Sequence, residues 1–172
     1  LVTFHPVTLE HGSASDQMVN LLSILEKLED VHLIFTMPNS DTDGHILFKM
    51  IEEFVVRHPN AKAFISLGHL RYLSCVKHID GVIGNSSSGL VEVPSFKKGT
   101  INIGDRQRGR LKAKSVIDCE PREISIRNAI RKLYSPEFQT VLTTVQNPCG
   151  SGGASEAIVD ILKEISLDNI LK

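Results

Sequence analysis

Cysteine is scarce in this sequence: only Cys75, Cys119 and Cys149 occur among its 172 residues. They are odd in number, far apart and without the paired spacing of a metal site, which disfavours both a disulfide framework and a structural zinc site. We expect reduced thiols with a structural role in a reducing compartment. We also expect no metal site and no cofactor.

The sequence also lacks an excess of charge and any long apolar run. Its 19 Lys and Arg are balanced by 20 Asp and Glu, a formal net charge of −1, so no overall field exists to hold nucleic acid or an anionic membrane. No apolar stretch approaches the roughly 20 residues of a membrane-spanning helix. These absences predict a cytoplasmic protein that binds neither nucleic acid nor a membrane.

Two glycine-rich nucleotide motifs are missing as well. No G-x-G-x-x-G follows the first apolar run, and no G-x-x-x-x-G-K-[ST] occurs, which disfavours the usual dinucleotide site and the P-loop. No repeat of 20–50 residues is visible, which disfavours a solenoid. The chain opens directly on the strand-like run LVTF, so we expect it to be cut from a longer protein.

What is present suits one packed domain. Hydrophobic residues make up 41% of the chain, enough for a core at this length. Short apolar runs rich in β-branched residues predict buried parallel strands, over residues 1–4, 31–37, 61–67, 81–84, 99–104 and 114–119. Apolar residues three and four apart predict helices between and after them, over residues 15–28, 46–55, 70–77, 88–96, 123–133 and 153–165.

This alternation of strands and helices predicts an α/β fold, a doubly wound, mostly parallel Rossmann-like sheet with helices on both faces. Ser15 or Asp16 is the expected cap of the first helix. In such sheets, ligands bind beyond the carboxyl ends of the strands. Four polar segments are expected on that rim, at residues 5–15, 38–44, 84–89 and 105–110.

The rim segment GNSSSG, residues 84–89, allows three interpretations. A nucleophile elbow is disfavoured, because the spacing differs from G-x-S-x-G and the last histidine, His78, precedes the serines. A polar helix cap at Ser86 or Ser87 is one remaining interpretation. The other is an anion cradle, in which Ser86, Ser87, Ser88 and Gly89 let backbone N–H groups and hydroxyls approach an oxyanion.

Glu92 lies about one turn into the helix that this segment is expected to begin. There its carboxylate could accept two ribose hydroxyls, as in many nucleotide sites. The alternative is an acidic residue that complements the helix dipole. Together the serines and Glu92 favour a nucleotide site.

Five segments together carry a family resemblance: TFHPVT, MPNSDTDG, GNSSSGLVEVPS, INIGDRQRGR and NPCGSGGAS. Over about residues 1–165, they resemble the carboxyl-terminal half of UDP-N-acetylglucosamine 2-epimerases. The resemblance implies the carboxyl-terminal lobe of a two-lobed, glycosyltransferase-B type enzyme. Residues 1–172 would form this single nucleotide-sugar-binding lobe, and the amino-terminal lobe would be absent from this chain.

The resemblance also implies roles for individual residues. His5 matches the catalytic histidine that faces the diphosphate and the sugar, and Glu92 matches the ribose-binding glutamate. The other matching ligand-binding positions are Asn39 near the nucleotide, Ser86 and Ser87 at the phosphates, and Arg106 in a closing loop. From the residues alone, a histidine at a strand end such as His5 is more often structural, and Asn39 fits a common Asx-turn.

Arg106 begins a run of five cations in nine residues, completed by Arg108, Arg110, Lys112 and Lys114. Such a run is usually a solvated surface. Here it lies on the expected ligand rim, where a diphosphate needs neutralising. We expect a functional role for Arg106 and assign none to the other four.

His5-Pro6 and the segment MPN differ from the non-hydrolysing bacterial branch of the family. The resemblance therefore implies a hydrolysing enzyme that eliminates UDP from UDP-N-acetylglucosamine and adds water to give N-acetylmannosamine, for sialic acid and related sugars. It implies a homodimer or homotetramer, and carboxylate acids and bases that lie largely in the other lobe. A diacetamido sugar, a glycosyltransferase of the same architecture and a non-catalytic nucleotide-binding module remain alternatives.

Overall fold

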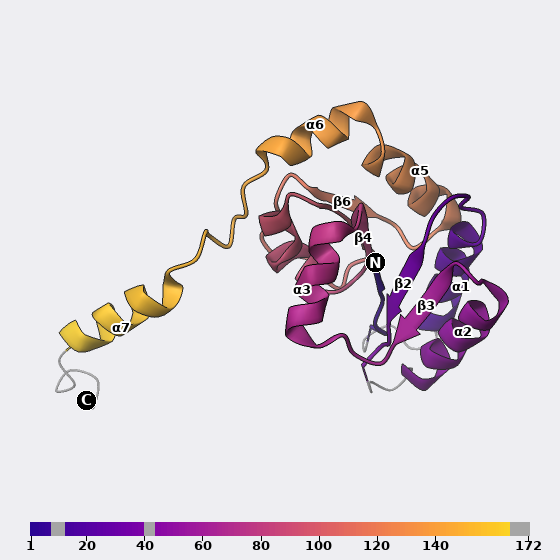
Figure 1. Ribbon diagram of the computed structural model, residues 1–172, viewed down its shortest axis with the longest axis horizontal. Helices are drawn as coiled ribbons and strands as arrows, with labels where there is room; N and C mark the ends of the chain where they lie inside the picture. The colour runs from indigo at the N-terminus through magenta and orange to yellow at the C-terminus, as the bar shows by residue number, and fades with distance from the viewer. Residues whose placement is uncertain (8–12, 40–43, 166–172) are drawn as a thin grey trace.

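The protein folds around a six-stranded, all-parallel sheet in the order β3-β2-β1-β4-β5-β6 (Figure 1). The structure is a computed structural model that describes residues 1–7, 13–39 and 44–165. The strands are β1 (Val2–Thr3), β2 (Leu33–Thr36), β3 (Ala61–Phe64), β4 (Gly81–Gly84), β5 (Gly99–Ile103) and β6 (Val116–Cys119). Each lies inside a range predicted from the sequence, so all six strand predictions are confirmed.

Helices cover both faces of the sheet, as predicted. One layer contains α1 (Ser13–Leu25), α2 (Gly44–Arg57) and α5 (Glu123–Leu133), with α6 (Pro136–Thr144) packed on α5. The other contains α3 (Gly68–His78), α4 (Ser88–Val91) and the 3-10 helix η1 (Val93–Phe96). Helices connect β1 through β5 in turn, and a loop without a helix leads from β5 to β6. All neighbouring strands run parallel, with Val2 beside Phe35 on one side and Ile83 on the other.

Two predictions about helices are wrong, and one helix was not predicted. The helix expected over 88–96 is two short pieces, because Pro94 has no N–H to continue the α-helical ladder. Helix α1 begins at Ser13, so Ser15 and Asp16 lie inside its first turn and do not cap it. Helix α6 was not predicted, although its start has a recognisable signature: Pro136 follows a cap, Ser135, whose hydroxyl accepts from the Phe138 N–H.

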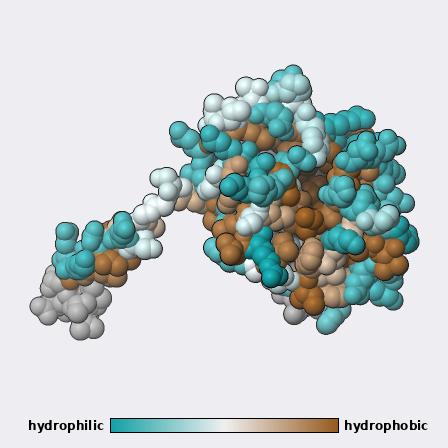
Figure 2. Space-filling view, in the orientation of Figure 1, coloured by the Kyte–Doolittle hydropathy of each residue, from teal (hydrophilic) through white to brown (hydrophobic). Residues whose placement is uncertain are grey.

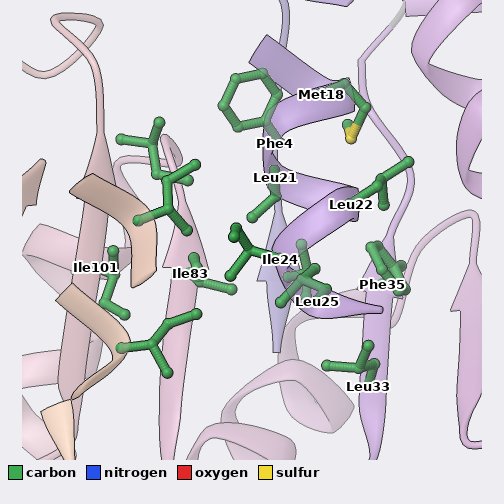
Figure 3. Packing of buried hydrophobic residues seen from close by; sticks show 14 of the residues in the cluster. Phe4, Met18, Leu21, Leu22, Ile24, Leu25, Leu33, Phe35, Ile83 and Ile101 are labelled. Atoms are coloured by element: carbon green, nitrogen blue, oxygen red, sulfur yellow. The ribbon is translucent and has the colours of Figure 1, made fainter. Parts of the chain in front are cut away.

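The core has one large and one small cluster, on opposite sides of the sheet. In the large one, Phe4 and side chains of α1 pack against β2, β4 and β5 (Figure 3). Phe35 and Phe54 meet edge to face, with ring centroids 5.6 Å apart. Each such buried side chain contributes about 1.5–3 kcal/mol. The packed sheet therefore gives the loops at its carboxyl edge a rigid base.

Helix α7 (Ala154–Glu164) lies apart from this body, at the end of an extended segment (Figure 1). Its exposed side chains include Ile158, Ile161 and Leu162, and Figure 2 shows brown, hydrophobic surface on that arm. Within the described ranges, no helix has the length and hydropathy to cross a bilayer.

All three cysteines are free thiols, and burial raises the pKa of Cys119 to about 12.

Candidate functional site

The site lies where the order of the strands reverses, between the central strands β1 and β4. Loops that leave two such strands move apart and open a crevice. No side chain fits at the end of β4: a Cβ on Gly84 would lie 1.9 Å from the Thr3 carbonyl oxygen. That oxygen accepts from the Asn85 N–H at 3.1 Å. Only glycine permits this approach, and its φ of +143° is one that other residues rarely adopt.

The serine turn after β4 keeps hydrogen-bond donors available. Ser87 occupies the cap position of α4, but its side chain makes no capping hydrogen bond, so the cap interpretation is wrong for Ser87. The Ser86 hydroxyl makes two long contacts: it accepts from the Ser88 N–H at 3.4 Å, as a cap would, and lies 3.2 Å from the Ser88 hydroxyl. Among the residues that the structure describes, none accepts from the N–H groups of Ser86 and Ser87. Two adjacent N–H groups and nearby hydroxyls can therefore bind an anion.

The helix after the turn adds little to anion binding. Helix α4 has four residues, too few aligned peptide dipoles for a substantial macrodipole. Glu92 follows the last residue of α4, where a negative charge gains nothing from a helix dipole. The dipole interpretation of Glu92 is therefore wrong, and a different reason for this carboxylate is required.

Gly89 is buried against β5 rather than at the open side of the turn. A Cβ on Gly89 would lie 2.6 Å from the Thr100 Cγ2 atom, and the Thr100 hydroxyl donates to the Gly89 carbonyl at 2.7 Å. The missing side chain thus lets α4 pack on the sheet. That it also contacts a ligand stays a prediction.

A cavity of about 380 Å³ opens beside the turn. Ser86, Ser88 and the half-buried Glu92 line it on one side, and the loop from β3 into α3, including Leu67 and Gly68, lines it on the other. Its volume lies in the usual range for a small-molecule site. Hydroxyls, a carboxylate and an apolar wall therefore face one space.

Tyr72 from α3 also lines this cavity, and the sequence analysis missed it. The Tyr72 hydroxyl is hydrogen-bonded to the Ser88 hydroxyl. The Ser88 hydroxyl also lies 3.2 Å from the Ser86 hydroxyl. Burial raises the Tyr72 pKa, and the nearby Glu92 charge adds to the shift. No local pattern marks this tyrosine, because it contacts the turn only after α3 and α4 have packed on the same face.

The raised Tyr72 pKa predicts a loss of stability at high pH. Unfolded tyrosine titrates near pH 10, so above about pH 10 the unfolded state releases a proton that the folded state still holds. The free energy of unfolding should therefore fall as the pH rises above about 10, and should fall less in Tyr72→Phe.

Urea unfolding on both sides of this pH measures the effect. With two tyrosines and no tryptophan in the chain, ultraviolet absorbance also follows tyrosinate directly. Burial raises the Tyr134 pKa too, so Tyr72→Phe identifies which titration step is which. A Tyr72 midpoint no higher than that of the unfolded chain would contradict the prediction.

His5 and Asn39 are brought together next to the cavity, although neither lines it. The Asn39 N–H donates to the Nδ1 atom of His5 at 3.2 Å. Because Nδ1 accepts, the proton of the neutral imidazole resides on Nε2. The half-buried His5 is therefore held as an Nε2–H donor. The contact uses the backbone of Asn39, and a role for its side chain stays a prediction.

Arg106 reaches the same region from the loop after β5. Its guanidinium donates to the Asn85 carbonyl at 3.3 Å. Two other cations of the run pair with carboxylates, Arg108 with Asp105 and Lys112 with Asp118. Arg106 is thus the cation of the run that contacts the serine turn.

Within the described part of the chain, no group of three or more His, Cys, Asp or Glu side chains is placed to hold a metal ion.

Residues 1–163 match the family model described as UDP-N-acetylglucosamine 2-epimerase. The chain belongs to this family. It is 39% identical over 99% of its length to the hydrolysing GDP/UDP-N,N'-diacetylbacillosamine 2-epimerase of Campylobacter jejuni, and 38% identical over 95% to the polysialic acid biosynthesis protein P7 of Escherichia coli. The family resemblance carried by the rim segments is confirmed.

The chain spans less than half of these relatives, 44% and 42% of their lengths. Solved structures agree on the fold. The UDP-N-acetylglucosamine 2-epimerase of Neisseria meningitidis, bound to UDP-N-acetylglucosamine, matches 95% of this chain with a TM-score of 0.78 at 15% identity, over 44% of its own length. The S. aureus MnaA–UDP structure matches with a TM-score of 0.75 at 16% identity, over 95% of this chain and 44% of its own.

Proposed function

We propose that residues 1–172 form the nucleotide-sugar-binding lobe of a hydrolysing UDP-N-acetylglucosamine 2-epimerase, with the amino-terminal lobe outside this chain. The main support for the proposal is that the serine turn and Glu92 line the same cavity. Unpaired N–H groups suit phosphate oxygens, and a carboxylate suits ribose hydroxyls. The hydrolysing names of two similar relatives support the reaction type.

The cavity suggests how UDP lies. Its diphosphate accepts from the N–H groups and hydroxyls of Ser86 and Ser87, with Arg106 as the nearby cation. The ribose hydroxyls donate to Glu92. The base then occupies the far wall, where the loop at Leu67 and Gly68 completes the cavity.

In the proposed reaction, the bond from sugar C1 to the diphosphate oxygen breaks and the proton at C2 is removed, giving UDP and a 1,2-unsaturated glycal. Water then adds its hydroxyl at C1 and a proton at C2, which releases N-acetylmannosamine. This lobe stabilises the charge that develops on the leaving UDP. His5 can donate its Nε2–H to that diphosphate, whereas the carboxylate acids and bases belong to the other lobe.

A diacetamido sugar is a second candidate substrate, favoured by one observation. Two similar relatives, from Campylobacter jejuni and Legionella pneumophila, are named for UDP-N,N'-diacetylbacillosamine. The three free thiols support work in a reducing compartment, in keeping with the cytoplasmic prediction. A homodimer or homotetramer stays a prediction.

Calorimetric titration of the chain with UDP tests the proposal. We expect saturable binding with a Kd of about 0.1–1 mM, weaker binding of UMP, which lacks the second phosphate, and none of NAD. The chain alone should release no free N-acetylmannosamine. A folded chain that does not bind UDP, or one that binds NAD as tightly as UDP, would overturn the proposal. Acceptor sugars offered to a longer protein containing both lobes distinguish a glycosyltransferase.

A further inference from the structure

Asn85 is almost fully buried, with 1% of its surface exposed, yet it sits between the loops of the candidate site. Its side-chain amide forms two hydrogen bonds with the backbone of His5. Oδ1 accepts from the His5 N–H at 2.8 Å, and Nδ2 donates to the His5 carbonyl at 2.8 Å. These residues are 80 positions apart in the sequence.

The backbone of Asn85 makes further contacts. Its N–H donates to the Thr3 carbonyl at the end of β1, and its own carbonyl accepts from the Gln107 side chain at 2.7 Å and from Arg106 at 3.3 Å. Gln107 is also 1% exposed. The backbone and side-chain polar groups of Asn85 thus join the loops that follow β1, β4 and β5.

A fourth loop is joined through His5. The imidazole Nδ1 of His5 accepts from Asn39, which follows β2. The orientation of the ring therefore depends on two neighbours: Asn85 places the backbone of His5, and Asn39 holds the ring. An amide side chain carries the donor and the acceptor on separate atoms, which lets Asn85 bind both backbone groups of His5.

We propose that Asn85 is the positioning residue of this site, which orients His5 relative to the serine turn and Arg106, with Gln107 supporting it from behind. The part that concerns UDP rests on the proposed function. Asn85 is too buried to contact a nucleotide, so it acts through the residues that it holds. A buried amide that only stabilised the fold would have no specific effect on the His5 ring.

The test compares Asn85→Ala with Asn60→Ala. Asn60 is the matched control, because its Nδ2 also donates to a backbone carbonyl, that of Val31. It directly precedes β3 and so lies at the amino-terminal ends of the strands, away from the site. The first measurement needs no ligand: ¹⁵N NMR of the histidine rings, with the His5 signals assigned by their loss in His5→Gln. We expect unprotonated Nδ1 and protonated Nε2 in the wild type and in Asn60→Ala, and a mixture of tautomers in Asn85→Ala.

The second measurement is UDP binding, expected to weaken about tenfold in Asn85→Ala and less than about twofold in Asn60→Ala. If Asn85→Ala does not fold, Gln107→Met serves instead. It removes the donor to Asn85 together with an oxygen that has no partner among the described residues, and should weaken UDP binding about threefold in a stable protein.

The outcomes separate the two proposals. An unchanged His5 tautomer in Asn85→Ala, or a Gln107→Met protein with wild-type UDP affinity, overturns the positioning role. Wild-type protein that does not bind UDP overturns the proposed function, while the His5 spectra still decide whether Asn85 positions the ring.

Discussion

Gly84→Ala is expected to destabilise the protein by about 4 kcal/mol or more, at the upper end of single-substitution effects. The added Cβ would lie 1.9 Å from the Thr3 carbonyl oxygen and 2.6 Å from its carbon. These are main-chain atoms in the centre of a parallel sheet, so they cannot rotate away as a side chain can. The φ of +143° adds strain for any residue with a side chain. Urea unfolding followed by circular dichroism measures the loss.

Gly109→Ala is the matched control for backbone conformation. Gly109 also has a positive φ, +78°, but nothing lies within 4 Å of where its Cβ would be. Its substitution should cost only about 1–2 kcal/mol. If the two variants lost the same stability, the close approach of β1 and β4 would not be the reason for Gly84. Because Asn85 follows Gly84 directly, any folded Gly84→Ala protein should also bind UDP less tightly.

Glu92→Gln is expected to weaken UDP binding about 30-fold, or about 2 kcal/mol, because a charged acceptor of two ribose hydroxyls is replaced by a neutral amide. The carboxylate lines the cavity beside Ser86 and Ser88. Calorimetry with UDP measures the change. Glu137→Gln, in the exposed first turn of α6, is the control and should bind as the wild type does.

2′-Deoxy-UDP separates a ribose contact from a general charge effect. The wild type should bind it about tenfold less tightly than UDP, whereas Glu92→Gln should bind the two nucleotides about equally. A Glu92→Gln protein that kept the full preference for UDP would place the ribose elsewhere, even if its overall affinity fell.

Local sequence was sufficient for the sheet and for the general position of the site. Runs such as GVIG at 81–84 combine β-branched residues with flanking polar residues. This pattern can be read from the sequence because whether a side chain is buried depends largely on its own hydrophobicity. The alternation with helices then requires parallel strands, and parallel strands place the polar segments on one rim. His5, Ser86, Glu92 and Arg106 could be proposed from that order and from the family resemblance.

Local sequence did not determine how those rim residues are held. A cap at Ser86 or Ser87 on a regular helix was one interpretation of the turn, but α4 has four residues and the Ser87 side chain does not cap it. The contact of Gly89 with a ligand stays a prediction, but nothing in the local sequence indicated that its missing side chain makes room for Thr100. Both depend on the distance between α4 and β5, which the whole packed layer sets.

Two contacts of the site join residues from different elements of the chain. Asn85 and His5 are 80 positions apart, and the hydroxyl of Tyr72 in α3 meets that of Ser88 in α4. A hydrogen bond requires its atoms within a few tenths of an ångström of one geometry, whereas a hydrophobic pattern specifies only which side of an element is buried. The sequence therefore determined the strands, their succession along the chain and the rim, and only the tertiary structure, through the register of β1 against β4, decided that Asn85 would hold His5.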